Sequence, residues 1–208
     1  RVLRVYNRLL LAGKSDAVIV IRWTGGQTRF VQEKIFDKGV IAPLSWQACG
    51  EVGHIFLGSD INLYITNGTQ TKPLPFNVQK ELQETMSITN AGISVGVVDD
   101  DQTTYHLFYS TSTTDTWLRG RLSYNYQSGE FYRSKFAGHQ IVRATAYKQS
   151  ETIKNKIIVS ASDNLVYETE LGTDDNGTAV SRIYDTDYHN YGVQGDKYLT
   201  GARLLFTG

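Results

Sequence analysis

The chain has 208 residues and carries 21 Lys and Arg against 21 Asp and Glu, so it is formally neutral. A protein that grips nucleic acid or an anionic membrane usually has a basic excess, and the bulk composition argues against both roles. The single cysteine excludes an internal disulfide and a multi-cysteine zinc site, and no apolar run approaches the roughly 18 residues of a membrane-spanning helix.

The sequence predicts β-structure nearly throughout, because its 13 Tyr, 8 Phe and 3 Trp, with many Thr, Val and Ile, suit a pleated, half-buried surface. Residues 1–7 already alternate like a strand. The further predicted strands are Leu9–Ala12, Ala17–Trp23, Arg29–Ile35, His54–Leu57, Asn62–Thr66, Ile93–Val98, Thr104–Ser110, Arg119–Tyr126, Glu130–Lys135, Ile141–Lys148, Lys156–Ser160, Leu165–Glu170 and Val180–Asp185. Between them lie the turn signals Gly25-Gly26, Asn67-Gly68, Asp99–Asp101, Ser128-Gly129 and Asp174–Gly177.

One stretch, residues 77–86, favours a helix. It follows Pro75 and contains good helix formers, and its apolar residues Val78, Leu82 and Met86 recur at i, i+4 and i+8. Asn77 is the expected N-cap. We therefore expect one short helix of about three turns on the outside of a sheet.

Two stretches about a hundred residues apart follow the same pattern, IFLGSDINLYITNG at residues 55–68 and IIVSASDNLVYETELG at residues 157–172. In each, an aliphatic strand leads through Ser-Asp into an alternating strand that ends at Gly, which is typical of a β-hairpin. A third hairpin with a longer loop joins Thr104–Ser110 to Arg119–Tyr126. The hairpin centres lie near residues 60, 115 and 163, and repeats of about 40–50 residues are typical of propeller blades.

The predicted fold class is therefore all-β, with propeller-like blades of antiparallel strands. We expect residues 1–172 to form a partial β-propeller of three to four blades, and residues 173–208 to form a linker with final blade strands or the start of a further β domain. A β-sandwich is the alternative, since it also has many short strands separated by turns. Strand-like residues at both ends lead us to expect a piece of a longer polypeptide.

The chemistry-bearing residues are interpreted as structural. The histidines are scattered without a metal-ligand partner at short spacing: His54, His106, His139 and His189. The Asp99–Asp101 cluster could hold a cation, but it separates two predicted strands and is interpreted as a solvated hairpin tip, and Asp174–Gly177 as a turn. Cys49 is expected to be a small buried hydrophobe. We expect no catalytic residue, no metal and no cofactor, and hence a non-enzymatic protein.

A partner contact is predicted at the loop between the strands of the third hairpin. Trp117 lies in the polar stretch STSTTDTWLRG beside Arg119 and Arg121. Aromatic and arginine side chains carry much of the binding energy at protein interfaces. These three residues are therefore the candidate contact site.

Three parts of the chain resemble the tail nozzle, or packaged-DNA stabilization, proteins of short-tailed bacteriophages. The matching stretches are Asn7–Gly13, Lys38–Ser45 leading to Gly53–Asp60 and Tyr64–Gly68, and Tyr124–Tyr132. One departure is that such hairpins often turn on Asp-Gly, whereas here Ile61 follows Asp60 and Asn164 follows Asp163.

The resemblance implies a structural component of the virion tail, a nozzle or connector that forms part of the DNA conduit. Its implied partners are portal, adaptor and tail fibre proteins and further copies in a homo-oligomeric ring, with only transient, non-specific contact with DNA and no membrane. A neutral surface suits a conduit through which DNA slides.

Two other functions stay open. A carbohydrate- or receptor-binding propeller would need clustered arginines and acidic groups at the mouth of its axis, and Arg119, Arg121, Asp99 and Asp101 are the candidate cluster. A general protein-interaction propeller is the third hypothesis. The repeated Ser-Asp hairpin is a device of the fold and does not separate the three.

Overall fold

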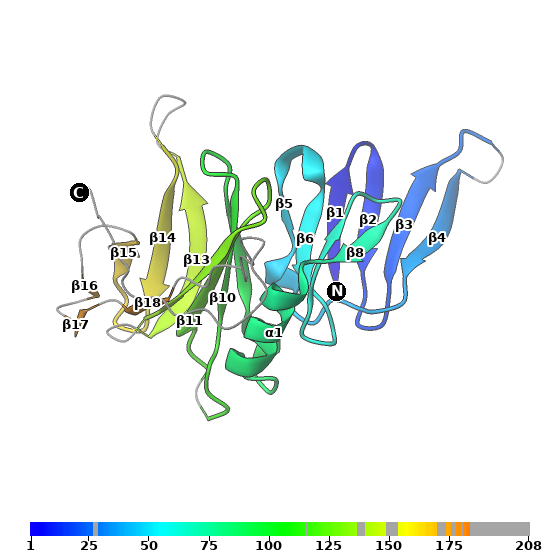
Figure 1. Cartoon of the computed structure of the whole chain (residues 1–208). Helices are drawn as coiled ribbons and strands as arrows, with labels where there is room; N and C mark the ends of the chain where they lie inside the picture. The colour runs from blue at the N-terminus through cyan, green and yellow to red at the C-terminus, as the bar shows by residue number, and fades with distance from the viewer. Residues whose placement is uncertain are drawn as a thin grey trace, which may run out of the picture.

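The computed structural model describes residues 1–26, 29–114, 116–136, 140–148 and 154–169, and the backbone alone of 174–175, 178–179 and 181–183. Figure 1 shows small antiparallel sheets that follow one another in chain order, from β1–β4 at one end of the molecule to β13–β15 at the other. The all-β fold class is confirmed, and the sheets do not close on themselves, which is consistent with propeller-like blades or with a sandwich; we call the four successive sheets blades 1 to 4.

The first sheet, blade 1, is a four-stranded meander of β1 (Val2–Tyr6), β2 (Leu9–Gly13), β3 (Val18–Trp23) and β4 (Phe30–Phe36). Its first turn has only two residues, Asn7 and Arg8, with φ values of 45° and 65°. This left-handed pair is the hairpin turn whose twist matches that of its strands. Residues 1–7 therefore form a strand and its turn, as their alternation predicts.

Blade 2 has the same order of strands: β5 (Gln47–Ala48), β6 (His54–Leu57), β7 (Leu63–Thr66) and β8 (Thr71–Pro73). Two 3-10 turns, η1 (Pro43–Ser45) and η2 (Gly50–Val52), lie on either side of β5. Strands β5 and β8 were not predicted, because segments of two and three residues are too short to show an alternating pattern.

The predicted helix is present as α1 (Phe76–Thr85), but its expected N-cap is wrong. Pro75 occupies the capping position with an extended ψ of 148°, so the helix begins one residue earlier and Asn77 lies inside its first turn. A proline before the first turn needs no N–H partner, which explains the shift. Val78, Leu82 and Met86 are buried in the core between blades 2 and 3.

Blades 3 and 4 follow α1 and the 3-10 turn η3 (Ala91–Ile93). Blade 3 contains β9 (Val95–Asp99), β10 (Thr104–Tyr109), β11 (Gly120–Asn125) and β12 (Phe131–Lys135), and β18 (Ser181–Ile183) pairs with β12. Blade 4 contains β13 (Ile141–Tyr147), β14 (Lys156–Ala161) and β15 (Val166–Glu168), and a separate hairpin pairs β16 (Asp174–Asp175) with β17 (Thr178–Ala179). His139, His189, residues 184–185 of the last predicted strand and the rest of the chain beyond them lie outside the described residues.

Among the described residues, three apolar cores separate the four blades. Within β6, Phe56 points to the core shared with blade 1, whereas Ile55 and Leu57 point to the core shared with blade 3. The same alternation in β10 sends Leu107 toward blade 2 and Phe108 toward blade 4. Blades 2 and 3 therefore bury both faces, so that each blade depends on its neighbours.

Candidate functional site

The repeated Ser-Asp stretches form two turns of the same geometry. In the first, the N–H of Gly58 donates to the carbonyl of Asn62 at 2.8 Å, and the N–H of Ile61 donates back to Gly58 at 3.1 Å. The equivalent bonds of the second turn join Ala161, Leu165 and Asn164. Ile61 and Asn164 have φ values of 64° and 65°, the conformation for which glycine is usual. The turn therefore keeps its geometry although Ile61 and Asn164 stand where glycine is usual.

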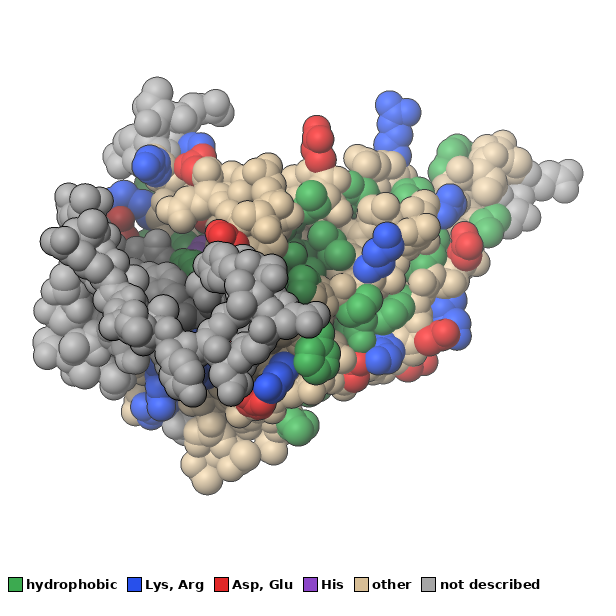
Figure 2. All heavy atoms as spheres, viewed as in Figure 1, with side chains coloured by type: hydrophobic (Ala, Val, Ile, Leu, Met, Phe, Trp, Pro, Cys, Tyr) green, Lys and Arg blue, Asp and Glu red, His purple; other side chains and the backbone are tan. Residues whose placement is uncertain are grey.

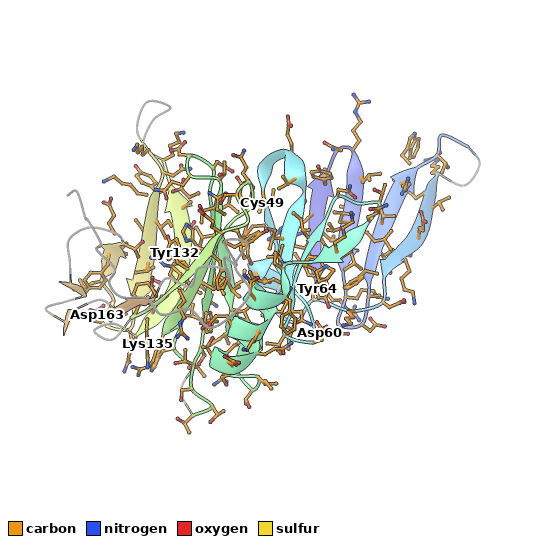
Figure 3. The ribbon with its side chains drawn as sticks, in the orientation of Figure 1. Cys49, Asp60, Tyr64, Tyr132, Lys135 and Asp163 are labelled. Carbon is orange, nitrogen blue, oxygen red and sulfur yellow. The ribbon has the colours of Figure 1, made fainter. Side chains whose placement is uncertain are left out.

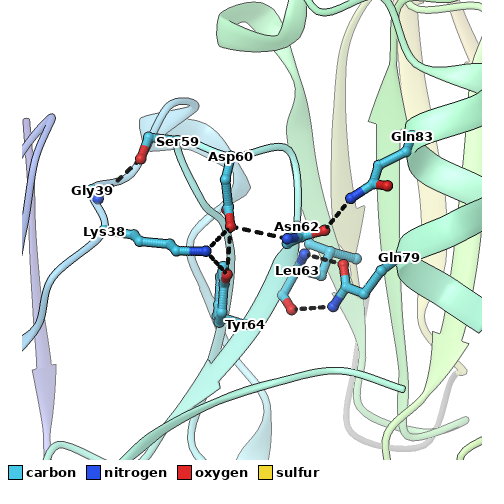
Figure 4. Close-up of polar contacts among 9 residues, drawn as sticks. All are labelled: Lys38, Gly39, Ser59, Asp60, Asn62, Leu63, Tyr64, Gln79 and Gln83. Atoms are coloured by element: carbon cyan, nitrogen blue, oxygen red, sulfur yellow. Dashed lines mark hydrogen bonds and ion pairs between the residues drawn. The ribbon is translucent and has the colours of Figure 1, made fainter. Parts of the chain in front are cut away.

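The aspartate of each turn accepts a hydrogen bond from a tyrosine four residues later. Asp60 Oδ2 accepts from Tyr64 Oη at 2.7 Å and from Asn62 Nδ2 at 2.9 Å, and it also binds Lys38 Nζ (Figure 4). In the second turn Tyr167 donates to Asp163 at 2.5 Å. Burial raises the pKa of Asp60, but its three donors together outweigh burial and lower it below 3.8. Asp60 is therefore an ionised anchor.

The serine of each turn fastens the segment that enters the same blade. The N–H of Ser59 donates to the carbonyl of Gly39 at 2.9 Å, and the N–H of Ser162 donates to that of Gln140 at 3.0 Å. Figure 3 shows that Asp60 and Asp163 both lie toward the lower edge of the molecule. We infer that the repeated stretch is a structural clamp that fixes the segment entering a blade to the turn between that blade's second and third strands.

Blade 1 has a third Ser-Asp pair at the corresponding position, which the sequence pattern alone does not reveal. Ser15 and Asp16 lie between β2 and β3, just as Ser59 and Asp60 lie between β6 and β7. Gly39 passes so close that a Cβ there would lie 1.9 Å from the carbonyl carbon of Ser15. The match is hidden because the strand that follows Ser15-Asp16 lacks the tyrosine.

The first strands of blades 2, 3 and 4 line a shared groove of about 430 Å³, which we call the first-strand groove. Strand β9 contacts both β5 and β13, and Gln47 Nε2 donates to the carbonyl of Gly96 at 2.9 Å. Most of the lining is small or apolar. Its charged residues are one arginine, Arg143, and one aspartate, Asp100, so the groove has no net charge.

The Asp99–Asp101 cluster connects blade 3 to blade 4 and is more than the solvated tip expected. The buried Asp99 Oδ1 accepts from the N–H of Asp101 at 3.0 Å. Asp101 accepts from the N–H of Asn155 at 2.6 Å and from Lys148 Nζ at 3.1 Å, and these contacts lower its pKa. Among the residues that the structure describes, no group of His, Cys, Asp and Glu has the arrangement of a metal site.

The three predicted contact residues differ in exposure. Trp117 and Arg119 are half-buried, but Arg121 is 2% exposed and does not lie on the surface. Its guanidinium lies over the rings of Phe108 and Phe136, at 6.0 and 5.6 Å from their centroids. Alternation along β11 points Arg121 into the core shared with blade 4. With Asp99 also buried, the proposed glycan-binding cluster is not assembled on the surface.

Two features have the outward form of a hydrolase site. His106 Nδ1 and Ser123 Oγ lie 2.7 Å apart, but both residues are fully buried, and burial lowers the pKa of His106 to about 3. The stretch Gly92–Gly96 has the spacing Gly-x-Ser-x-Gly, yet its buried Ser94 precedes a strand, whereas a nucleophile elbow follows one. Neither arrangement offers a substrate access to the hydroxyl.

The remaining features are a buried thiol and a pocket. Cys49 is fully buried, as expected, and burial raises its pKa to about 12, so the thiol is unreactive. A pocket of about 340 Å³ lies between α1 and blade 3, near Lys135 in Figure 3. It is lined by Thr85, Tyr109, Thr111, Gly120, Arg133, Ser134 and Lys135.

Comparison with known proteins finds no family model and no curated sequence that matches the chain. The site must therefore be interpreted from its own geometry. Among the described residues, no helix has the length and hydropathy needed to cross a bilayer.

Proposed function

We propose that the chain is a non-enzymatic structural component of a bacteriophage tail, in which its blades form part of a ring around the DNA conduit. The observation that carries the proposal is the first-strand groove. Its charged lining residues, Arg143 and Asp100, balance each other. DNA affinity grows with the number of phosphates that a protein neutralises, so a neutral wall lets the polymer slide.

The arrangement of the blades gives further support. In a propeller, blades stack around a central channel. Here β5, β9 and β13 are each the first strand of a blade, and they lie side by side along one groove. The clamps at Ser59 and Ser162 hold the segments that enter blades 2 and 4. The proposed ring continues the same stacking through further copies.

Mass photometry and negative-stain imaging of the purified protein test this function. We expect a discrete oligomer with an open central channel, and DNA binding too weak to detect at 150 mM salt. A stable monomer, or tight binding to duplex DNA, would overturn the proposal. The variant Asp100→Lys makes the groove positively charged and should gain measurable DNA binding that weakens with salt.

A glycan-binding module is the second candidate, favoured by the pocket beside Lys135. Its lining offers the cation of Lys135 and the hydroxyls of Thr85 and Thr111 to an acidic sugar, whereas the cation of Arg133 is already paired with Glu81. A glycan array with the wild type and Lys135→Ala tests this function, with Lys72→Ala on the exposed strand β8 as the matched control. Binding that only Lys135→Ala abolishes would favour this candidate.

A further inference from the structure

Blade 1 buries one face against blade 2, and no other described residues cover its opposite face. The register pairs Leu3 with Ala12, Val5 with Leu10 and Trp23 with Phe30, which places these side chains on one side of the sheet. That side, which we call the outer face of blade 1, carries two polar residues of β4, Gln32 and Lys34, and eight apolar residues: Leu3, Val5, Leu10, Ala12, Ile19, Ile21, Trp23 and Phe30.

The exposure of this face is unusual for the surface of a monomer. Val5 is 70% exposed and Trp23 is 61% exposed. Hydrophobic side chains are visible among charged ones at the β3–β4 end of the molecule in Figure 2. A hollow of about 560 Å³ lies over Ala12, Ile19 and Ile21. Contiguous apolar surface of this kind marks an interaction site.

The sequences of β2 and β3 also indicate that the outer face of blade 1 is an interaction site. Residues 9–12 read LLLA and residues 18–21 read VIVI, without the polar alternation of a strand that faces solvent. Continuous apolar strands belong to sheets that are covered on both faces. Blades 2 and 3 are covered in this way within the chain, and the outer face of blade 1 has the composition for the same packing.

The opposite end of the row presents a second sheet face. On blade 4, Tyr147, Ile158 and Val166 point away from the core that blade 4 shares with blade 3, and we call this side the outer face of blade 4. Val166 is 66% exposed. The Lys156–Glu168 ion pair, at 2.8 Å, lies on the same side. Among the described residues, no further sheet covers either of these two end faces.

We propose that the outer face of blade 1 packs against the outer face of blade 4 from a second copy of the chain. The contact continues the blade-on-blade packing that already occurs at three cores within the molecule. It joins different surfaces, so it is head-to-tail, and such contacts form rings when the rotation closes. The inference rests on the proposed function, because it names the contact through which the ring forms.

Sedimentation velocity over a range of concentrations tests the contact with Val5→Lys. A lysine there places an unpaired charge in the apolar interface, so we expect the dissociation constant to rise at least about tenfold. Ile88→Lys is the matched control, because Ile88 is also 70% exposed but lies on neither end face. Circular dichroism of both variants confirms that they fold.

Mixing two variants tests the direction of the contact. Val5→Lys damages one end of a copy and Val166→Lys damages the other, so each variant alone should dissociate. Together they retain one intact pair of faces and should form a dimer that grows no further. A channelled oligomer unaffected by Val5→Lys would overturn the contact while the proposed ring stands. A wild-type protein that stays monomeric would overturn both, and a Val5-dependent oligomer insensitive to Val166→Lys would overturn the head-to-tail arrangement.

Discussion

At the scale of single residues, the Ser-Asp repeat acts through one carboxylate. Asp60 receives hydrogen bonds from Lys38, Asn62 and Tyr64, and its pKa is lower than 3.8. We expect Asp60→Asn to lower the free energy of unfolding by about 1–2 kcal/mol, because a neutral amide loses the charge assistance of these bonds. Urea denaturation at pH 7 measures the loss.

The control for Asp60 is Asp37, whose ion pair with Lys34 at 2.5 Å lies in solvent. Asp37→Asn should leave the denaturation midpoint unchanged, since exposed pairs contribute little. Because the folded pKa of Asp60 is depressed, its contribution is complete above pH 3.8 and disappears as the pH falls through the folded value. Equal midpoint shifts for the two variants at pH 7 would contradict the anchoring role.

A second residue makes stability depend on pH in a different range. Burial, with a smaller effect from Arg121, lowers the pKa of His106 from 6.5 to about 3. Between these values the unfolded chain binds a proton that the folded chain does not bind, so stability falls as the pH drops below 6.5. The slope from His106 is at most about 1.4 kcal/mol per pH unit.

His106→Gln keeps a hydrogen-bonding group near Ser123 and removes this titration. We expect urea denaturation between pH 6.5 and roughly 4.5 to show that the stability of the variant depends less steeply on pH than that of the wild type. This holds even if the variant is less stable at pH 7. Some slope should remain, because burial also lowers the pKa of His54. An unchanged slope would mean that His106 is protonated in the folded protein.

At the scale of elements, helix α1 completes the backbone bonding of blade 2 through one side chain. Gln79 accepts from the N–H of Leu63 at 2.8 Å and donates to the carbonyls of Leu63 and Leu74 at 2.7 and 3.2 Å. Gln79→Met leaves a buried N–H unpaired, and we expect a loss of about 2–3 kcal/mol in chemical denaturation.

The neighbouring Gln83 provides the matched control for Gln79. It lies one helical turn further on α1 and donates to Asn62 Oδ1 at 2.8 Å in an exposed position. Gln83→Met should cost less than about 1 kcal/mol, because water replaces the lost partner. A loss as large as that of Gln79→Met would show that helix propensity or packing, and not the bond to blade 2, decides the effect.

The sequence predicts the elements whose patterns are local. Strands β10 and β11 and helix α1 carry an apolar period long enough to be recognised. The paired Ser-Asp turns are visible for the same reason. Strands β5 and β8 are too short to show a period. Helix α1 begins earlier than predicted because Pro75 takes the capping position. The length of a segment therefore decides whether its sequence pattern can predict it.

The candidate sites depend on contacts between blades, which local pattern does not contain. Trp117, Arg119 and Arg121 are close in sequence, but strand alternation sends Arg121 into the core. The first-strand groove joins residues from β5, β9 and β13, which lie about 50 residues apart along the chain. These residues become neighbours only when the blades stack, so the sequence alone does not predict the groove.

At the scale of the whole molecule, stability is distributed by stacking. Among the described residues, blades 2 and 3 have apolar cores on both faces, whereas blades 1 and 4 each have one covered face. In a linear stack, each unit is held by its own strands and by its nearest neighbours. Blades 1 and 4 are therefore the units that should open at lower free energies than blades 2 and 3.

Hydrogen–deuterium exchange measures this order directly. At low protein concentration we expect the amides of β2 and β3 to exchange faster than those of β10 and β11, because blade 1 opens without unfolding the rest. Raising the concentration should slow exchange in blade 1, since a second copy then covers its outer face, and should leave β10 and β11 unchanged. In Val5→Lys the concentration dependence should vanish. Equal protection of blades 1 and 3 at every concentration would mean that the four blades unfold as one cooperative unit.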